Sequence, residues 1–465
     1  PRPLAILSNR FFQSIIPKMN SKTTDISNPK KAITFIYPGI TTCGFGSFGK
    51  GMDSSWVSHG LGYLSAVLKK KGYVVDLIDL RTISGWTEFR KLIKKKRPSV
   101  VGIPMMSVDY NPGIKAAKTV KKIDPSIKII VGGPHPTLAP NELIKHKEID
   151  YIFKGEGEIT LPVLLEKIFR KEQAERIIQG AKPDLNKLPF VDREIFSALE
   201  KPIVKELPEP FLTTIAGRGC VYNCSFCKPA ENTIFGLPVR RRSVQNVIRE
   251  LNFLRRKYHF QSLMIHDDCL LENSIWAEEF CKEYKKAKFK QPFVCQSRAD
   301  LICRNEKLVK KMKKTGLFMF LIGFESGSQR VLNFIRKGTT VEQNYRAAEI
   351  CRKYGIKIWA NYMVGLPTET KNEVMETVWM IRKIKPDYYS PAYFTPHPGS
   401  DLYEYCQKNK LSLIKNHDQY NRGHLDAKIK GHDYRFLKWA VDRSTGETFL
   451  RKVMRKLRYL GLLPQ

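Results

Sequence analysis

Two long stretches of the sequence alternate short apolar runs, rich in β-branched residues, with segments of helical periodicity. The first stretch covers residues 32–170 and the second covers residues 211–399. This alternation is typical of parallel sheets, because a crossover between parallel strands leaves room for a helix. We therefore predict an α/β protein with an N-terminal doubly wound, Rossmann-like domain followed by a partial (β/α)6, TIM-like barrel.

The segments outside these two stretches show weaker patterns. Residues 1–31 are predicted to be an N-terminal extension, in which residues 1–18 are upstream read-through and Met19 is the natural start. Residues 171–210 are rich in proline and charge, which predicts a linker between the two domains. Residues 400–465 are basic and are predicted to be a small helical region that packs on the protein or lies on a surface.

Composition narrows the class of protein and its expected location. Hydrophobic residues make up 42% of the chain and the charges are scattered, which favours a globular protein over a disordered one. No apolar run is long enough to predict a membrane span, and the start lacks a secretory cleavage pattern. Ten cysteines are too sparse for a disulfide scaffold, so we expect a cytoplasmic protein.

The net charge leaves two interpretations open. Lys and Arg number 80 against 45 Asp and Glu, which gives a formal charge of +35. Such an excess indicates an anionic partner, either a membrane lipid, a nucleic acid or a phosphorylated substrate, because summed charge steers association. A generally lysine-rich composition explains it equally well.

Three cysteines stand close together, directly after the first predicted strand of the barrel. Cys220, Cys224 and Cys227 lie in GRGCVYNCSFCKP with the spacing C-x3-C-x2-C. Three thiolates on one loop can hold three irons of a cubane cluster and leave the fourth iron open to a substrate. Zinc would need a fourth ligand at conventional spacing, which the sequence lacks nearby, and unrelated structural cysteines are the other alternative. The strand context and the neighbouring Phe226 favour the cluster.

This loop resembles the signature of the radical S-adenosylmethionine superfamily. The resemblance implies a 4Fe–4S cluster whose open iron chelates S-adenosylmethionine and whose electron cleaves it to methionine and a 5′-deoxyadenosyl radical. It also implies that residues at the barrel strand ends, with the later segment 361–370, contact S-adenosylmethionine. The candidates for these contacts, in chain order, are Phe226, Asp267, Asp268, Gln296, Arg298, Glu325 and Ser326.

The first stretch narrows the resemblance to the cobalamin-binding branch of that superfamily, through the segments GGPHPT, DYIFKGEGEIT and TPHPGSDLY. The residues that the resemblance places on loops close to the corrin are Gly132, Gly133, Gly155 and Glu156. The Asp-x-His-x-x-Gly loop that supplies an axial histidine elsewhere is replaced by PGITTCGFG. His59 and His135 are more typical of hydrogen-bonded histidines than of ligands. We therefore expect cobalamin without a histidine lower ligand, and a domain that has lost the cofactor is the alternative.

The other cysteines and the aromatic residues of the last predicted strand have simpler interpretations. Free cysteine behaves as a small hydrophobe, so most later cysteines are predicted to be buried thiols. These are Cys269, Cys281, Cys295, Cys303, Cys351 and Cys406. Cys43 lies in the glycine-rich loop that should face the corrin. Aromatic residues on and near the last strand either line an apolar substrate cavity or belong to the core. These are Tyr362, Tyr388, Tyr389, Tyr393 and Phe394.

Together these features favour a cobalamin-dependent radical enzyme that methylates an unactivated carbon of a lipid or another small molecule. The resemblance implies two molecules of S-adenosylmethionine, one that methylates cobalamin and one that gives the radical. An electron donor such as ferredoxin or flavodoxin is the expected protein partner. An anionic membrane surface is a further candidate partner, which would make the protein peripheral on the inner membrane face.

Three alternative functions remain open at this point. One is a radical cyclase, oxidase or carbon–carbon coupling enzyme without methyl transfer. Another is an RNA-modifying, methylthiotransferase-like enzyme, which the positive charge favours. Nucleic acid is nevertheless the less favoured partner, because the C-terminal region lacks the aromatic pattern of an RNA-binding barrel. The last is a non-catalytic sensor, which would make the strand-end residues accidental.

Overall fold

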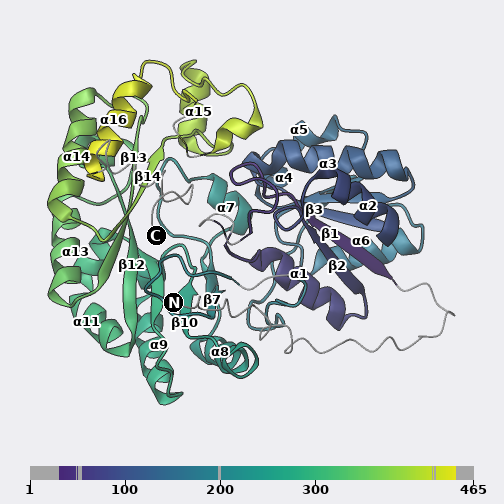
Figure 1. Cartoon of the computed structure of the whole chain (residues 1–465), viewed down its shortest axis with the longest axis horizontal. Helices are drawn as coiled ribbons and strands as arrows, with labels where there is room; N and C mark the ends of the chain where they lie inside the picture. Colours follow the sequence, from purple (N-terminus) through teal and green to yellow (C-terminus); the bar gives the residue numbers. More distant parts are fainter. Residues whose placement is uncertain are drawn as a thin grey trace, which may run out of the picture.

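The computed structural model describes residues 31–48, 50, 55–196, 200–421, 423 and 426–446. Within them the chain forms two six-stranded parallel sheets and a two-stranded antiparallel ribbon. Figure 1 shows the first sheet in purple and blue beside the second sheet in teal and green. The α/β fold predicted from the alternation is therefore confirmed. Residues 1–30 of the predicted extension, Met19 included, and the C-terminal end from residue 447 lie outside the described residues.

The first sheet is doubly wound, with the strand order β2-β1-β3-β4-β5-β6. Its strands are β1 Ala32–Tyr37, β2 Val74–Asp79, β3 Val100–Pro104, β4 Lys128–Gly132, β5 Tyr151–Lys154 and β6 Ile177–Gln179. The helices are α1 His59–Lys70, α2 Trp86–Lys96, α3 Tyr110–Ile123, α4 Pro134–Leu138, α5 Pro140–Ile144 and α6 Thr160–Phe169, with a short turn η2 Ser107–Asp109. The strand order reverses between β1 and β3, and ligands of such sheets bind at the carboxyl ends of the strands near this reversal.

Two local features of this half differ from what the sequence pattern indicates. The helical pattern over residues 138–146 predicts one helix, but the structure has only the shorter α5 there, because α4 ends at Leu138 and Ala139 is non-helical. Ala139 precedes Pro140, and a residue before proline is disfavoured in the helical region. The predicted linker contributes β6, a three-residue strand that pairs with β5 at the sheet edge.

The second sheet confirms the predicted partial barrel, with the strand order β14-β13-β12-β11-β10-β7, all parallel. Its strands are β7 Phe211–Thr214, β10 Ser262–Ile265, β11 Phe293–Ser297, β12 Leu317–Glu325, β13 Lys357–Val364 and β14 Tyr388–Tyr393. Its helices are α8 Val244–Tyr258, η3 Leu270–Glu272, α9 Ser274–Lys286, α10 Ala299–Arg304, α11 Glu306–Thr315, α12 Gln329–Phe334, α13 Val341–Lys353 and α14 Lys371–Ile384. Alternate strand residues pack outward on these helices in the largest core cluster of the described chain.

The C-terminal region returns across both halves of the molecule. It contains α15 Asp401–Lys408, the short turn η4 His417–Tyr420 and α16 Tyr434–Ser444. Leu437 and Ala440 of α16 share an apolar cluster with Val378 of α14. The Tyr362 hydroxyl of β13 hydrogen-bonds the Ser444 hydroxyl at the end of α16. Among the described residues, no helix combines the length and the apolar character needed to cross a bilayer.

Candidate active site

The three clustered cysteines lie on one tight loop between the antiparallel ribbon and the short helix α7 Ala230–Phe235. The ribbon pairs β8 Gly217–Arg218 with β9 Arg240–Arg241. The amide of Cys227 donates to the Cys224 carbonyl at 3.0 Å, which closes the turn. Cys224 is buried, Cys220 is half-buried and Cys227 is exposed, and all three are free thiols. The three sulfurs therefore lie on one short segment, residues 220–227.

Residues around this loop fix its backbone. Gly219 has φ +104, a left-handed conformation that favours glycine directly before Cys220. The Ser225 amide donates to the Ile335 carbonyl at 2.9 Å and thereby ties the loop to the barrel. The buried Lys228 ammonium donates to the Cys220 carbonyl at 2.7 Å. The same ammonium also contacts the Glu231 carboxylate.

Arg298 is a predicted strand-end residue whose side chain contacts the cysteine loop. Its guanidinium donates to the Cys224 sulfur at 3.7 Å and lies 3.6 Å from the centre of the Tyr222 ring. Its Nε is fixed by the Asp300 carboxylate at 2.9 Å. Hydrogen bonds to cysteine sulfurs tune the redox potential of iron–sulfur clusters. Arg298 is thus held where it would act on a ligand of the cluster.

The ionisation of the thiols fits a metal-bound role. Desolvation by the surrounding protein, followed by the carboxylates of Asp268 and Glu231, raises the pKa of Cys227 to about 12. Desolvation likewise raises the pKa of Cys220. Isolated thiolates are therefore unfavourable here, whereas iron supplies the positive charge that deprotonated ligands need. Three cysteines on one loop suit a 4Fe–4S cluster with one open iron.

The adjacent acids Asp267 and Asp268 have different surroundings. Asp267 is buried after β10, where its carboxylate accepts the Ala216 amide at 2.6 Å and the Arg241 guanidinium at 2.7 Å. It thereby holds the ribbon against the barrel. Asp268 is exposed to the space beside the cysteine loop. Desolvation by the surrounding protein, then Glu231 and Asp267, raise the pKa of Asp268 to about 6. Only Asp268 has its carboxylate open to a ligand.

The remaining predicted barrel residues make contacts within the protein. The Gln296 amide donates to the Asp267 carbonyl at 3.3 Å, so this side chain supports β10. Glu325 has φ +62 at the end of β12 and forms an ion pair with Lys337 at 2.7 Å. The buried Ser326 hydroxyl lies 3.1 Å from the Thr377 hydroxyl. Phe226 packs partly buried against the apolar cluster beneath the cysteine loop.

The predicted corrin loops follow β4 and β5 of the first sheet. Gly133 has φ +100, and a Cβ there would lie 3.2 Å from the Met105 carbonyl, so the position needs glycine. Gly132 is the last residue of β4, and Gly155, directly after β5, has φ +76 and donates its amide to the Thr137 hydroxyl at 2.9 Å. These glycines therefore let the loops pack closely on the protein at the carboxyl ends of β4 and β5, which is the edge where doubly wound sheets bind ligands.

Glu156 has a role that the sequence did not indicate. Its buried carboxylate forms ion pairs with Arg218 and Arg240 of the ribbon beside the cysteine loop. Glu158 accepts the second arm of the Arg218 guanidinium at 2.6 Å. The Glu156 carboxylate is therefore occupied by the other half of the molecule. Arg218, Arg240 and Glu158 are functional candidates that the sequence analysis missed.

The same region brings the two sets of loops together. Helix α4, which follows the glycines of β4, packs beside α7, which follows the cysteine loop (Figure 1). Gly399 lies against both helices, since a Cβ there would come 2.9 Å from Leu138 and 3.4 Å from Ala230. The loops predicted for the corrin and for the iron–sulfur cluster therefore meet along one seam between the sheets.

His59, the first residue of α1, is hydrogen-bonded within the protein. The Nε2 atom of His59 lies 3.2 Å from the Thr213 carbonyl and 3.1 Å from the Thr213 hydroxyl. Burial, followed by the charge of Arg193, lowers the pKa of His59 to about 4. His59 is thus a neutral, buried contact between α1 and β7. This arrangement agrees with the expectation that His59 is a hydrogen-bonded histidine.

The other predicted thiols and aromatic residues lie in the core for the most part. Five of the six later cysteines are buried, whereas Cys303, like Cys43, is half-buried. Tyr362, Tyr393 and Phe394 are buried, which supports the core interpretation. Tyr388 is half-buried and stacks on Trp359 with ring centres 5.6 Å apart.

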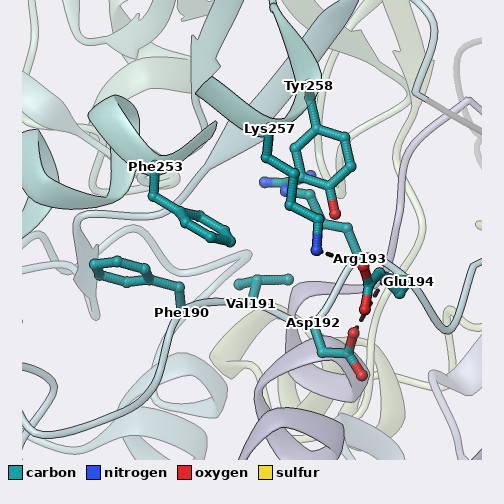
Figure 2. Close-up of a pocket in the computed structure, with 8 residues that line it drawn as sticks. All are labelled: Phe190, Val191, Asp192, Arg193, Glu194, Phe253, Lys257 and Tyr258. Carbon is teal, nitrogen blue, oxygen red and sulfur yellow. Dashed lines mark hydrogen bonds and ion pairs between the residues drawn. The ribbon is translucent and has the colours of Figure 1, made fainter. Parts of the chain in front are cut away.

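A small pocket lies away from these loops, between the linker and the end of α8 (Figure 2). It has a volume of about 270 Å³. Its lining residues are Phe190, Val191, Asp192, Arg193, Glu194, Phe253, Lys257 and Tyr258. Its charged side chains are paired, with Lys257 bound to Glu194 and Asp192 bound to Lys69. No lining residue belongs to the cysteine loop or to the strand ends, so this pocket is separate from the candidate active site.

Each half of the chain matches the model of a known protein family. Residues 214–381 match the model of the radical SAM superfamily, and residues 52–165 match the model of the B12 binding domain. An uncharacterized methyltransferase of Pyrococcus horikoshii is 29% identical over 374 residues, which cover 78% of this chain and 81% of that protein. The anaerobic magnesium-protoporphyrin IX monomethyl ester cyclase of Rubrivivax gelatinosus is 26% identical over 442 residues, covering 87% and 77%. The hopanoid C-3 methylase of Methylococcus capsulatus is 24% identical over 355 residues, covering 74% and 67%.

Solved structures share the fold. The cobalamin-dependent S-adenosylmethionine radical enzyme OxsB superposes with a TM-score of 0.66 at 16% identity, over 83% of this chain. The present chain spans 63% of the length of that structure. The radical S-adenosylmethionine methyltransferase TsrM from Kitasatospora setae superposes with a TM-score of 0.65 at 14% identity, covering 90% of this chain and 89% of that one.

Proposed function

We propose, since the chain belongs to the cobalamin-binding branch of the radical S-adenosylmethionine superfamily, that it transfers a methyl group to an unactivated carbon of a small molecule. A lipid is the substrate class that we favour. The hopanoid C-3 methylase of Methylococcus capsulatus is similar over 74% of this chain, and its name denotes methyl transfer to a lipid carbon.

The observation that carries this proposal is the seam between the two sets of loops. Methyl transfer between a corrin and a substrate radical requires both cofactors and the substrate to meet in one water-excluded space. Arg218 lies two residues before Cys220 and reaches Glu156 and Glu158, directly after the β5 loop. These buried ion pairs fix the cysteine loop relative to the loops of the first sheet.

The barrel residues have separable roles in this proposal. Cys220, Cys224 and Cys227 would hold the 4Fe–4S cluster, and Asp268 would accept a hydrogen bond from the ammonium group of S-adenosylmethionine. Arg298 would tune the cluster through its N–H contact with the Cys224 sulfur. When bound, the cluster, S-adenosylmethionine and cobalamin supply one-electron cleavage and methyl transfer.

The first sheet would hold cobalamin through backbone rather than through an axial side chain. Gly132, Gly133 and Gly155 lie at the strand ends after β4 and β5, where backbone groups of the loops would contact the corrin edge. His59 is bonded to Thr213 and is therefore not offered as a lower ligand. We expect cobalamin to bind without a histidine on its lower face.

The decisive experiment combines metal analysis with methyl tracing. The full chain is purified without oxygen in the presence of cobalamin, and iron and cobalt are measured in one sample. It is then supplied with S-adenosylmethionine labelled at the methyl group, a reductant with flavodoxin as electron donor, and extracted lipids. We expect about four irons and one cobalt per chain, with label in a lipid product. Four irons without cobalt, or a product without label, would contradict methyl transfer.

A matched pair of cysteine variants tests the cluster assignment. Cys224→Ala should lose the iron and abolish 5′-deoxyadenosine formation, because it removes one of three ligands. Cys281→Ala alters a buried thiol on α9, distant in sequence from the loop, and should keep both. Iron retained in the Cys224 variant at the wild-type level would refute the assignment.

A radical cyclase or oxidase is the second candidate, because the cyclase of Rubrivivax gelatinosus is similar over 87% of this chain. The same assay separates the two functions when magnesium-protoporphyrin IX monomethyl ester is supplied beside the lipids. A cyclase would form 5′-deoxyadenosine and an altered tetrapyrrole without incorporating labelled methyl.

We further propose that the outer surface of helices α14 and α16 contacts an anionic membrane. Trp379 on α14 and Trp439 on α16 are 58% and 47% exposed, on two helices that pack together. Exposed tryptophans are typical of membrane interfaces, and the positive charge of the chain would favour anionic lipid. Contact with a membrane would give the enzyme direct access to a lipid substrate.

A further inference from the structure

A second cluster of ligating side chains lies outside the cysteine loop, where the C-terminal region returns to the first sheet. His135 comes from α4, Glu142 from α5 and His417 from the turn η4. One ligand atom from each of the three lies within 4.8 Å of the other two. The cluster therefore joins residues from two parts of the chain that are more than two hundred positions apart in sequence.

The buried histidine of this cluster has an unused ring nitrogen. His135 is fully buried, and its Nε2 atom has no hydrogen-bond partner among the described residues. That atom points toward the Glu142 carboxylate, 3.7 Å away. Burying a polar atom without a partner is costly, so in a native fold such an atom is usually satisfied by a bound water or ion.

The other ring nitrogen of His135 is held in a way that suits metal binding. Its Nδ1 atom lies 3.2 Å from the Ser107 hydroxyl. A hydrogen bond at Nδ1 fixes the ring and leaves the lone pair of Nε2 directed at the cluster.

His417 is held by stacking on Tyr110 and by a contact with Glu142. Its ring stacks on Tyr110 with centres 3.8 Å apart and planes 13° from parallel. Its Nε2 atom lies 2.8 Å from the Glu142 carboxylate. The Tyr110 hydroxyl is itself fixed by the His146 Nε2 atom at 2.7 Å. The two outer ligands are therefore already oriented toward the same point as His135.

We propose that His135, Glu142 and His417 bind one divalent transition metal ion of the zinc class. Two imidazoles and a carboxylate are a common ligand set for zinc, and three protein ligands leave a fourth position for water or another donor. Ligand atoms around tetrahedral zinc lie about 3.4 Å apart, so shifts of about 1 Å would complete the geometry.

The ion would act as a clip that holds the C-terminal region on the first sheet. His417 belongs to the segment between α15 and α16, whereas His135 and Glu142 follow β4. A metal bond across this distance constrains a long loop. The clip would therefore stabilise the segment around η4, which packs against η2 and α3 of the first half. The proposed zinc site does not depend on the proposed methyl transfer, because it uses none of the residues assigned to the iron–sulfur cluster.

Zinc binding to the full chain tests the proposal directly. The iron–sulfur cluster is first reconstituted so that Cys220, Cys224 and Cys227 are occupied. Loosely held metal ions are then removed from the protein. Zinc chloride is titrated by calorimetry, and zinc is counted per chain after gel filtration. We expect one zinc per chain, and hydrogen–deuterium exchange of residues 411–421 should slow when zinc is present.

Conservative variants locate the ion. Glu142→Gln and His417→Gln should each weaken zinc binding by about 100-fold or more and remove the exchange protection. Both residues are only partly buried, so the fold should tolerate the changes. His432→Gln is the matched control, because His432 lies in the same region and bonds the Leu366 carbonyl instead.

Three results would overturn the proposal. The first is no zinc binding at micromolar concentration in the full chain. The second is one bound zinc whose affinity is the same in the Glu142 and His417 variants as in the wild type. The third is a loss of zinc in the His432 control equal to that in the other two. In the first case, the Glu142–His417 contact is a hydrogen bond only.

Discussion

The buried ion pairs between the two sheets allow a sharp test of how the halves cooperate. Replacing both acids (E156Q with E158Q) leaves Arg218 and Arg240 without these carboxylate partners. The side chains of Glu156 and Glu158 are 5% and 4% exposed and that of Arg218 is 11% exposed, so solvent replaces little of the lost interaction. Removing one partner of a buried ion pair costs about 3–5 kcal/mol. About 3 kcal/mol corresponds to a change of roughly 100-fold in an equilibrium.

The double variant should separate two activities that the wild type couples. Labelled methyl in product needs both halves in register, so we expect it to fall about 100-fold. Formation of 5′-deoxyadenosine needs only the cysteine loop and S-adenosylmethionine, so it should fall by less than about tenfold. Both products are measured in one anaerobic reaction, with iron and cobalt counted in the same sample.

A readout without substrate checks the physical reason. Pulsed electron paramagnetic resonance between the reduced cluster and paramagnetic cobalamin gives the distribution of distances between them. We expect a narrow distribution in the wild type and a broader one in the double variant. Glu194→Gln, which breaks the exposed pair with Lys257, is the control and should change neither product, since exposed pairs contribute about 1 kcal/mol or less. Parallel loss of both products with iron retained, or unchanged methyl transfer, would refute the reasoning.

Three further predictions follow from particular contacts. Arg298→Met should keep the iron but slow 5′-deoxyadenosine formation by about 10-fold to 100-fold in single-turnover assays, because the N–H contact with the Cys224 sulfur is lost; an unchanged rate would exclude a tuning role. Arg330 beside Glu373 lowers the pKa of this carboxyl to about 2, so its charge stabilises the fold above the ordinary pKa of glutamate and stops doing so as the pH falls toward 2. The melting temperature of Glu373→Gln, which keeps the helix cap, should therefore lie below that of the wild type at pH 7 and approach it on acidification; a gap independent of pH would contradict this. Trp379→Ala combined with Trp439→Ala should reduce sedimentation with anionic vesicles by about tenfold and leave the iron content unchanged, whereas unchanged sedimentation would remove the membrane as a partner of this face.

The sequence predicted the two sheets because their strands are short β-branched runs separated by helical periodicity. It did not predict β6 or the β8–β9 ribbon, since strands of three and two residues are too short to show a pattern. The helical pattern over 138–146 is longer than the helix itself, because Ala139 precedes Pro140 in a non-helical conformation and α5 ends at Ile144. Local pattern therefore specified the large elements, and short elements depended on contacts with the rest of the fold.

The candidate site was predictable in its residue types but less so in its contacts. Asp267 and Asp268 look equivalent in sequence, yet the strand directs one into the ribbon and leaves the other exposed. Glu156 was expected beside the corrin, but Arg218 and Arg240 lie 62 and 84 positions further along the chain. Pairing over such separations has no signal in a single sequence.

The charged seam between the sheets also limits how this architecture can be recombined. Glu156 and Glu158 directly follow a strand of the first sheet, and Arg218 directly precedes the cysteine loop of the second. A chimera that joins this first half to a foreign barrel would place two carboxylates against a surface without matching guanidinium groups. Exchange of the halves should therefore succeed only when the acids and the arginines are transplanted together, so the two domains are inherited as a matched set.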